Sequence, residues 1–314
     1  MPQRRALLAL ATGLPMAAHA QGAWRPDRPV QLWIAFAPGG AADVLARAVA
    51  ARIERARQWT IVPGNRTGGA GVVMAGALRT VPADGHILGV TTSAALVLPT
   101  VTQAPPPYVL EDFAPVARLA RVELSLVVRA DGPLRSAEDL RALARQRGVV
   151  NIAAQGPEVT LGIRAVGLHL GITLEPIPVR GGAEGMTQLL GGHLDAAVLA
   201  GVHTQAVRDG RLREILALGG TRTRLTPGAP TLRDLGLDVT VEPWFQVIAP
   251  RGIPAAALAA HVEAIREALA DPEIVALAAG RLSLVAEFVG PAETEARLRQ
   301  EAATMRRLHE AFGV

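Results

Sequence analysis

The first residues that could do chemistry are the glycines of Pro38-Gly39-Gly40, which separate an apolar run over 30–37 from an amphipathic pattern over 41–57. Glycine lets the backbone approach a ligand closely, and a helix start offers unpaired N–H groups and a positive dipole. Such a loop binds a carboxylate without any charged side chain. Asp43 lies in the first turn of the predicted helix, where it compensates the dipole, braces the loop or contacts a ligand.

Two further loops place hydroxyl and amide groups directly after predicted strands. Thr91-Thr92-Ser93 follows a strand expected over 86–91, and Gln155-Gly156 follows one expected over 149–154. Ligands in open α/β sheets lie beyond the carboxyl ends of the strands. We therefore expect all three loops to lie on one binding rim.

Motifs of common catalytic and cofactor sites are missing from the sequence. The dinucleotide fingerprint, the P-loop, G-x-S-x-G and H-E-x-x-H do not occur. The chain has no Cys, which excludes thiolate nucleophiles and Cys-ligated metal sites. The missing motifs lower the expectation of an enzyme without excluding one, and no metal site is expected because the seven His do not fall at metal-ligand spacing. His203 either faces a binding cleft or lies in a solvated loop.

Length and composition fit a globular protein of about two domains. The chain has 314 residues and 50% hydrophobic residues, enough for a large core. All 32 basic residues are Arg against 28 acidic residues, so the high pI of 10.9 reflects Arg chemistry rather than a large net charge. With only 3% aromatic residues as well, no nucleic-acid partner is expected.

The first twenty residues are typical of a secretory signal peptide. Arg4 and Arg5 precede an apolar stretch over 6–18, and Ala18-His19-Ala20 fits the small-x-small cleavage rule. The stretch is too short to span a bilayer, which needs ~20 apolar residues. We expect cleavage after Ala20 and a periplasmic protein, exported by either the general or the twin-arginine route.

Short apolar runs alternate with helical patterns along the rest of the chain, which predicts an α/β fold. Two such halves indicate two lobes that face a cleft, each a mostly parallel sheet flanked by helices. We expect residues 24–122 with 246–314 to form the first lobe, and 123–245 the second.

The chain resembles the Bug-type periplasmic solute-binding receptors of tripartite tricarboxylate transporters, from about Arg28 to the C-terminus. Each matching segment is weak alone, and their order and spacing carry the resemblance. The segments are Phe36-Ala-Pro-Gly-Gly-Ala-Ala-Asp43, Asn65-Arg-Thr-Gly-Gly-Ala-Gly71, Pro82-Ala-Asp-Gly85, Glu111-Asp-Phe-Ala-Pro-Val116, Leu189-Leu-Gly-Gly-His-Leu-Asp195 and Trp244-Phe245 followed by Ala249-Pro250.

This resemblance implies a two-lobed clamshell of the periplasmic-binding-protein type (type II-like), without catalysis or cofactor and monomeric. It implies a receptor that captures a small organic acid or related molecule and delivers it to membrane transporter subunits. A receptor that instead signals to a membrane sensor kinase is the alternative. The family's three ligand loops correspond here to the residues Phe36, Gly39, Gly40, Asp43, Thr91, Thr92, Ser93, Gln155, Gly156, Glu158 and Thr160, to which we add Arg180 from Val179-Arg180-Gly181.

The third loop departs from the family pattern, Ser-Gly-x-Gly-Ser/Thr-Ser. Glu158 replaces a glycine and Val159 replaces a hydroxyl residue. A cleft-facing Glu158 would repel a dicarboxylate at close range, so we predict a monocarboxylate, an amino acid or a neutral heterocycle rather than citrate. In the alternative, Glu158 points to solvent or pairs with Arg164 or Arg180.

Overall fold

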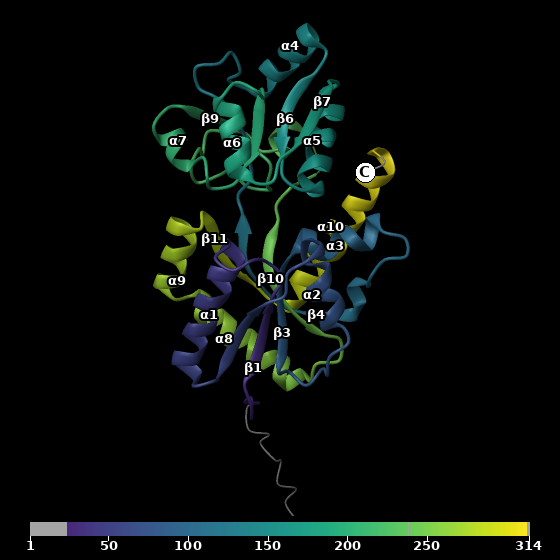
Figure 1. Ribbon diagram of the computed structural model, residues 1–314, viewed down its shortest axis with the longest axis vertical. Coiled ribbons are helices and arrows are strands. Elements are labelled where there is room, and N and C mark those ends of the chain that lie inside the picture. Colours follow the sequence, from purple (N-terminus) through teal and green to yellow (C-terminus); the bar gives the residue numbers. More distant parts are fainter. Residues whose placement is uncertain (1–23, 238, 313–314) are drawn as a thin grey trace, which may run out of the picture.

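The computed structural model describes residues 24–237 and 239–312 and shows two α/β lobes joined by crossing strands (Figure 1). The predicted signal peptide, residues 1–20, lies outside the described residues. No helix among the described residues is long and apolar enough to cross a membrane. The two-lobed α/β fold predicted from the sequence is confirmed.

The first lobe is built on a six-stranded sheet of order β11-β4-β10-β3-β1-β2. The half of the sheet formed by β3, β1 and β2 is parallel, since β1 pairs in parallel with both β2 and β3, whereas β10 and β11 run antiparallel to their neighbours. The strands are β1 (Val30–Ile34), β2 (Ile61–Asn65), β3 (Ile87–Thr92), β4 (Phe113–Val122), β10 (Trp244–Pro250) and β11 (Leu284–Val289).

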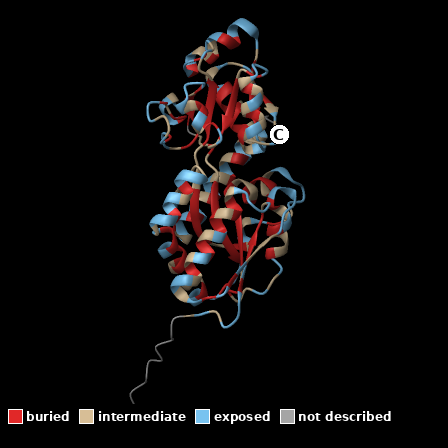
Figure 2. Cartoon of the chain, turned by 60° about the vertical axis from the view of Figure 1, so that its left-hand side comes forward, coloured by how far each residue is buried: buried red, intermediate tan, exposed pale blue. Residues whose placement is uncertain are grey.

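Helices cover both faces of this sheet and bury its two apolar surfaces (Figure 2). The helices packed on one face are α1 (Ala41–Arg57), α8 (Ala255–Leu269) and α9 (Pro272–Ala276). Those on the other face are α2 (Val72–Leu78), α3 (Ser93–Thr102) and α10 (Pro291–Phe312). Short helical turns span Gly69–Gly71, Leu110–Asp112, Arg233–Leu235 and Leu277–Arg281.

The second lobe has a five-stranded sheet of order β7-β6-β8-β5-β9, again with helices on both faces. Its strands are β5 (Ser125–Arg129), β6 (Val150–Ala154), β7 (Leu174–Pro178), β8 (Ala196–Leu199) and β9 (Leu212–Ala217). Its helices are α4 (Ala137–Arg147), α5 (Pro157–Leu170), α6 (Gly182–Leu190) and α7 (Thr204–Arg208). Ser136 caps α4 by accepting a hydrogen bond from the N–H of Asp139.

Both sheets are mixed, although most strands of each run in one direction: β10 and β11 are reversed in the first sheet and β5 in the second. The chain crosses between the lobes from β4 to β5 and from β9 to β10. The strands at these crossings, β4, β5, β9 and β10, pair antiparallel to their neighbours. In the first sheet, β4 ends at Val122 and β10 begins at Trp244. The lobe boundaries expected from the sequence were 122/123 and 245/246.

Helix α10 also connects the two lobes, since it contacts α5 as well as α3. Leu161 of α5 is fully buried in the apolar cluster that contains Leu298, Ala302 and Met305 of α10. At another edge, a Cβ on Gly201 would lie only 2.4 Å from the Cβ of Ser283, which precedes β11. The lobes therefore touch at two places around the crossing strands.

Trp24 packs against the first lobe where β1 and β3 begin. Its ring lies 5.9 Å from that of Trp59, 5.6 Å from that of His86 and 5.0 Å from that of His261. Figure 1 places this start of the described chain at the end of the first lobe that is remote from the second.

Candidate functional site

The first glycine loop is held in shape by Asp43. Its carboxylate accepts hydrogen bonds from the N–H of Gly39 (2.9 Å), from Nδ2 of Asn65 (2.8 Å) and from Nε of Arg47 (2.9 Å). Burial would raise the pKa of Asp43, but these bonds outweigh it and lower the pKa. Asn65 also donates to the carbonyl of Phe36 at 2.9 Å. Of the roles considered for Asp43, bracing the loop is the one the contacts show.

The Gly39-Gly40 segment leaves the start of α1 available to a ligand. Gly39 has φ +80°, a backbone conformation that favours glycine. Gly40 is the N-cap of α1, and no side chain caps this helix. The first N–H groups of α1 therefore keep their capacity for an anion.

The three hydroxyl residues at the end of β3, Thr91, Thr92 and Ser93, each have a different role in the structure. Thr92 caps α3, because its Oγ1 accepts a hydrogen bond from the N–H of Ala95 at 3.1 Å. Ser93 Oγ accepts one from the N–H of Trp244 at 3.2 Å, which ties α3 to the start of β10. Thr91 is buried within the sheet. Thr92 and Ser93 therefore already serve the structure of this rim.

The third loop leads into α5. Helix α5 begins at Pro157, directly after Gly156, since proline suits the first position of a helix. Gly156, at φ +88°, is the N-cap, and the Glu158 carboxylate lies over it, 2.9 Å from where a Cβ would be. Thr160 Oγ1 donates to the Gly156 carbonyl at 3.1 Å, and Gln155 is exposed.

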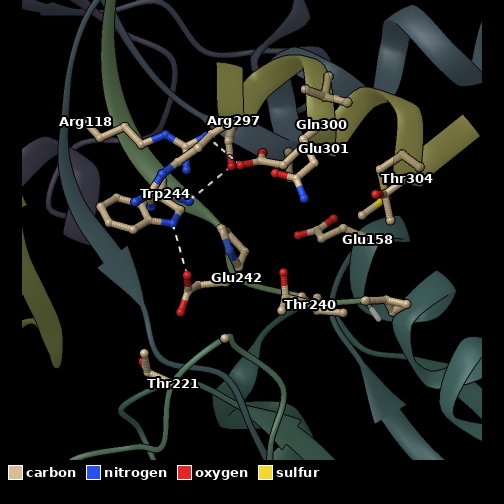
Figure 3. A pocket seen from close by; sticks show the side chains of 18 of the residues that line it. Arg118, Glu158, Thr221, Thr240, Glu242, Trp244, Arg297, Gln300, Glu301 and Thr304 are labelled. Carbon is tan, nitrogen blue, oxygen red and sulfur yellow. Dashed lines mark hydrogen bonds and ion pairs between the residues drawn. The ribbon is translucent and has the colours of Figure 1, made fainter. Parts of the chain in front are cut away.

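Glu158 neither points to solvent nor pairs with Arg164 or Arg180. Arg180 is 94% exposed and its guanidinium pairs with Glu184 at 3.1 Å. Among the described residues Glu158 makes no ion pair with Arg164 or any other cation, and burial raises its pKa. Its carboxyl faces a cavity between the lobes (Figure 3).

This cavity, the α10-side chamber, has a volume of about 340 Å³. Its walls come from α3 and α10 of the first lobe, from α5 of the second and from the segments around Thr221 and 239–244 near the crossings. Side chains that point into it in Figure 3 are Glu158, Thr240, Glu242, Trp244, Gln300, Glu301 and Thr304. Ser93 and Glu158 are the predicted site residues among its lining; the other ten lie outside that lining.

One wall of the chamber is a compact charged and aromatic group. Arg118, only 1% exposed, donates to Oε1 of Glu301 at 2.5 Å. The guanidinium of Arg118 lies 5.1 Å from the ring centre of Trp244, and that of Arg297 lies 5.2 Å from it. Burial raises the pKa of Glu301 although Arg118 opposes this effect.

Glu242 belongs to the same wall and is also compensated. It accepts a hydrogen bond from Nε1 of Trp244 at 3.3 Å and lies 3.5 Å from the guanidinium of Arg121. Sequence reasoning missed Glu242, Trp244 and the α10 residues as site candidates. Nothing in the sequence pattern of residues 293–312 indicates that the polar residues there meet the other lobe.

His203 neither lies in a solvated loop nor faces the chamber lining. It is buried in the second lobe, where its Nε2 is 2.6 Å from Oε1 of Glu214. The expectation of a solvated position is wrong because a buried carboxylate, not visible from local sequence, accepts its hydrogen bond. Among the described residues, no group of three His, Asp or Glu side chains is placed to hold a metal ion.

Comparison with known proteins identifies the family. Residues 45–307 match the family described as "Tripartite tricarboxylate transporter family receptor", TctC. The chain belongs to this receptor family. It is 33% identical to protein BugT of Bordetella pertussis over 262 residues, covering 80% of this chain and 79% of BugT. Members of the TctC family are periplasmic binding proteins, so this chain is a solute-binding receptor rather than an enzyme.

Solved TctC-like structures share the fold. A TctC solute-binding protein from Polaromonas without ligand superimposes with a TM-score of 0.82 at 23% identity, covering 91% of this chain and 99% of that one. Rpa4515 of R. palustris, solved with adipate, gives a TM-score of 0.76 at 24% identity, covering 92% and 98%. At these identities the likeness shows the two-lobed fold of the receptor.

Proposed function

We propose that this TctC-family chain is an exported periplasmic receptor, made with a signal peptide cleaved after Ala20. As a monomer it closes its lobes on a small organic acid and delivers it to membrane subunits of a tripartite tricarboxylate transporter. The observation that carries the proposal is the cavity of about 340 Å³ between the lobes. Both Ser93 of the first lobe and Glu158 of the second line it.

Binding would use groups from both lobes and so favour the closed form. Arg118 of the first lobe and Glu158 of the second line the cavity and present charged groups to a ligand held there. A ligand that contacts both residues binds the closed state better than the open one, and this difference in affinity drives closure. The transporter can then distinguish loaded from empty receptor.

The ligand class follows from the charges in the cavity. Rpa4515 is described with adipate, a dicarboxylate. In this chain Glu158 faces the cavity without a cation among the described residues, so a second ligand carboxylate would meet a like charge in a partly desolvated space. A ligand with one carboxylate fits these surroundings better than citrate or a short diacid.

Native mass spectrometry of the protein purified from the periplasm tests the receptor function. A bound small mass that is released on denaturation supports it, as does thermal stabilisation by an organic acid at concentrations above Kd. Capture of the transporter's membrane subunits from solubilised membranes, stronger with the ligand, supports delivery. The absence of any bound or stabilising solute in a broad screen of organic acids would overturn the proposal.

A further inference from the structure

Residues of both lobes line the α10-side chamber, so a ligand held there contacts side chains of both. Figure 3 shows Glu158 of α5 directed toward Gln300 and Thr304 of α10, with Thr240 below. Glu158, Thr240 and Thr304 present acceptor oxygens around one end of the chamber, beside the amide of Gln300. A donor group on the ligand therefore has several partners at that end.

Glu158 differs from the other acidic residues of the lining because it has no cationic partner among the described residues. Glu301 pairs with Arg118, and Glu242 lies beside Arg121. Glu158 has no such partner among the described residues, and its only hydrogen bond is from its own N–H. A desolvated carboxyl without a cation is costly, and a ligand ammonium would relieve this cost.

Arg233 also lines the chamber but does not neutralise Glu158 here. Its side chain is exposed, and it makes no ion pair with Glu158. The guanidinium of Arg297 binds Glu293 at 2.5 Å and lies over Trp244. Arg233 is therefore exposed to solvent, and Arg297 is already paired.

The opposite wall carries buried donors without partners. Nε of Arg118 has no hydrogen-bond partner among the described residues, although the side chain is 1% exposed and lines the chamber. Gln246, which pairs with Arg118 across β4 and β10, is also fully buried with neither amide atom partnered among the described residues, but it lies outside the chamber lining. Buried unpaired groups of this kind call for a ligand or water atom.

We propose that the chamber selects a small amino acid or similar zwitterion, whose ammonium group meets Glu158, Gln300 and Thr304. Its carboxylate is directed toward Nε of Arg118. This inference rests on the proposed receptor function and specifies its ligand. A diacid of the same length would place a carboxylate against Glu158, and a plain diamine would leave Arg118 Nε unpaired.

Matched pairs of probes test the proposal by isothermal titration calorimetry. In 4-aminobutanoate and glutarate, and in 5-aminopentanoate and adipate, one carboxylate is exchanged for an ammonium at equal chain length. For the unmodified chain we expect the amino acid of at least one pair to bind tenfold or more tightly than its diacid. Glu158→Gln should reduce this preference at least tenfold, because it removes the charge that the ammonium meets.

Glu175→Gln is the matched control, since it removes one exposed carboxylate from the same lobe, outside the chamber lining. It should leave the preference within threefold. Tighter binding of the diacid, or a preference unchanged in Glu158→Gln, overturns the inference while leaving the receptor function intact. So does a tenfold gain for the amino acid in Arg233→Gln, which would make Arg233 the cation of Glu158. Binding of no solute at all overturns both.

Discussion

Nε2 of His203 lies 2.6 Å from Oε1 of Glu214, and both side chains are almost fully buried in the second lobe. Glu214 also accepts hydrogen bonds from Ser125 (2.9 Å) and Thr223 (2.6 Å). One carboxylate thus joins β9, β5, the start of α7 and the segment after β9.

Glu214→Ala should therefore strongly destabilise the second lobe. It leaves His203, Ser125 and Thr223 buried without their shared acceptor, which typically costs about 3–5 kcal/mol. Urea unfolding checks this value, with Glu175→Ala, an exposed residue of the same lobe, expected within about 0.5 kcal/mol of the unmodified chain. A cost below 1 kcal/mol would contradict the anchoring role.

Stability should depend on the ionisation of Glu214 at acid pH. Burial alone would raise the pKa of Glu214, but the hydrogen bonds from His203, Thr223 and Ser125 lower it from 4.5 to about 2. A lowered pKa stabilises the folded state above pH 4.5, and this contribution is lost as the pH falls from 4.5 toward 2. The difference in unfolding free energy between the unmodified chain and Glu214→Gln should therefore shrink from pH 7 to pH 3. An equal difference at both pH values would refute this.

Removing one partner of the Arg118–Glu301 pair should lower the free energy of unfolding more than replacing both partners. Arg118→Met leaves Glu301 partly buried without its cation, with an expected loss of about 3 kcal/mol. In the double variant Arg118→Met/Glu301→Met no charge remains unpaired, so at least about 1 kcal/mol should return. Denaturant titration of the two single variants and the double variant measures the coupling. Additive losses would show that the two residues act independently.

Asp43→Ala should loosen the first glycine loop. The Gly39 N–H loses its acceptor, and Asn65 loses a bond that fixes its side chain against Phe36. Amide hydrogen exchange at Gly39 should accelerate at least tenfold, whereas the N–H of Asp139, capped by Ser136 in the other lobe, should keep its rate. Unchanged exchange at Gly39 would mean that Asp43 does not brace the loop.

Leu161→Ala should weaken the contact between α5 and α10. Leu161 is fully buried against residues of the first lobe, and truncating such a leucine costs about 2–5 kcal/mol. Leu168→Ala on the same helix is the control, because Leu168 is 70% exposed and its truncation should change stability by less than about 0.5 kcal/mol. Similar values for both variants would show that α5 does not depend on α10.

Local patterns predicted the elements that begin and end with clear signals. The amphipathic pattern over 41–57 matches α1, because glycines and apolar spacing act within a few residues. Helix α3 and strands β4 and β11 were missed. Pro99 lies inside α3 and Pro115 inside β4, and both contradict the usual local preferences.

The candidate site was only partly visible from the sequence, since long-range packing decides it. The departure at Glu158 was evident, and the structure places that carboxyl in the chamber. Gln300, Thr304 and Thr240 also line the chamber, and each lies more than 80 residues from Glu158 in the sequence. No sequence motif links them to Glu158. Mixed strand directions were equally hidden, because they depend on how the chain crosses between lobes.

Trp24 anchors the start of the described chain to the pole of the first lobe that faces away from the second, while α10 runs up beside α5. The two ends of the chain therefore have unequal mechanical roles. A fluorophore or surface linker attached just ahead of Trp24 would leave lobe motion free, whereas one attached after α10 would report on it or obstruct it. A biosensor made from this receptor should be immobilised through the first end and labelled at the second.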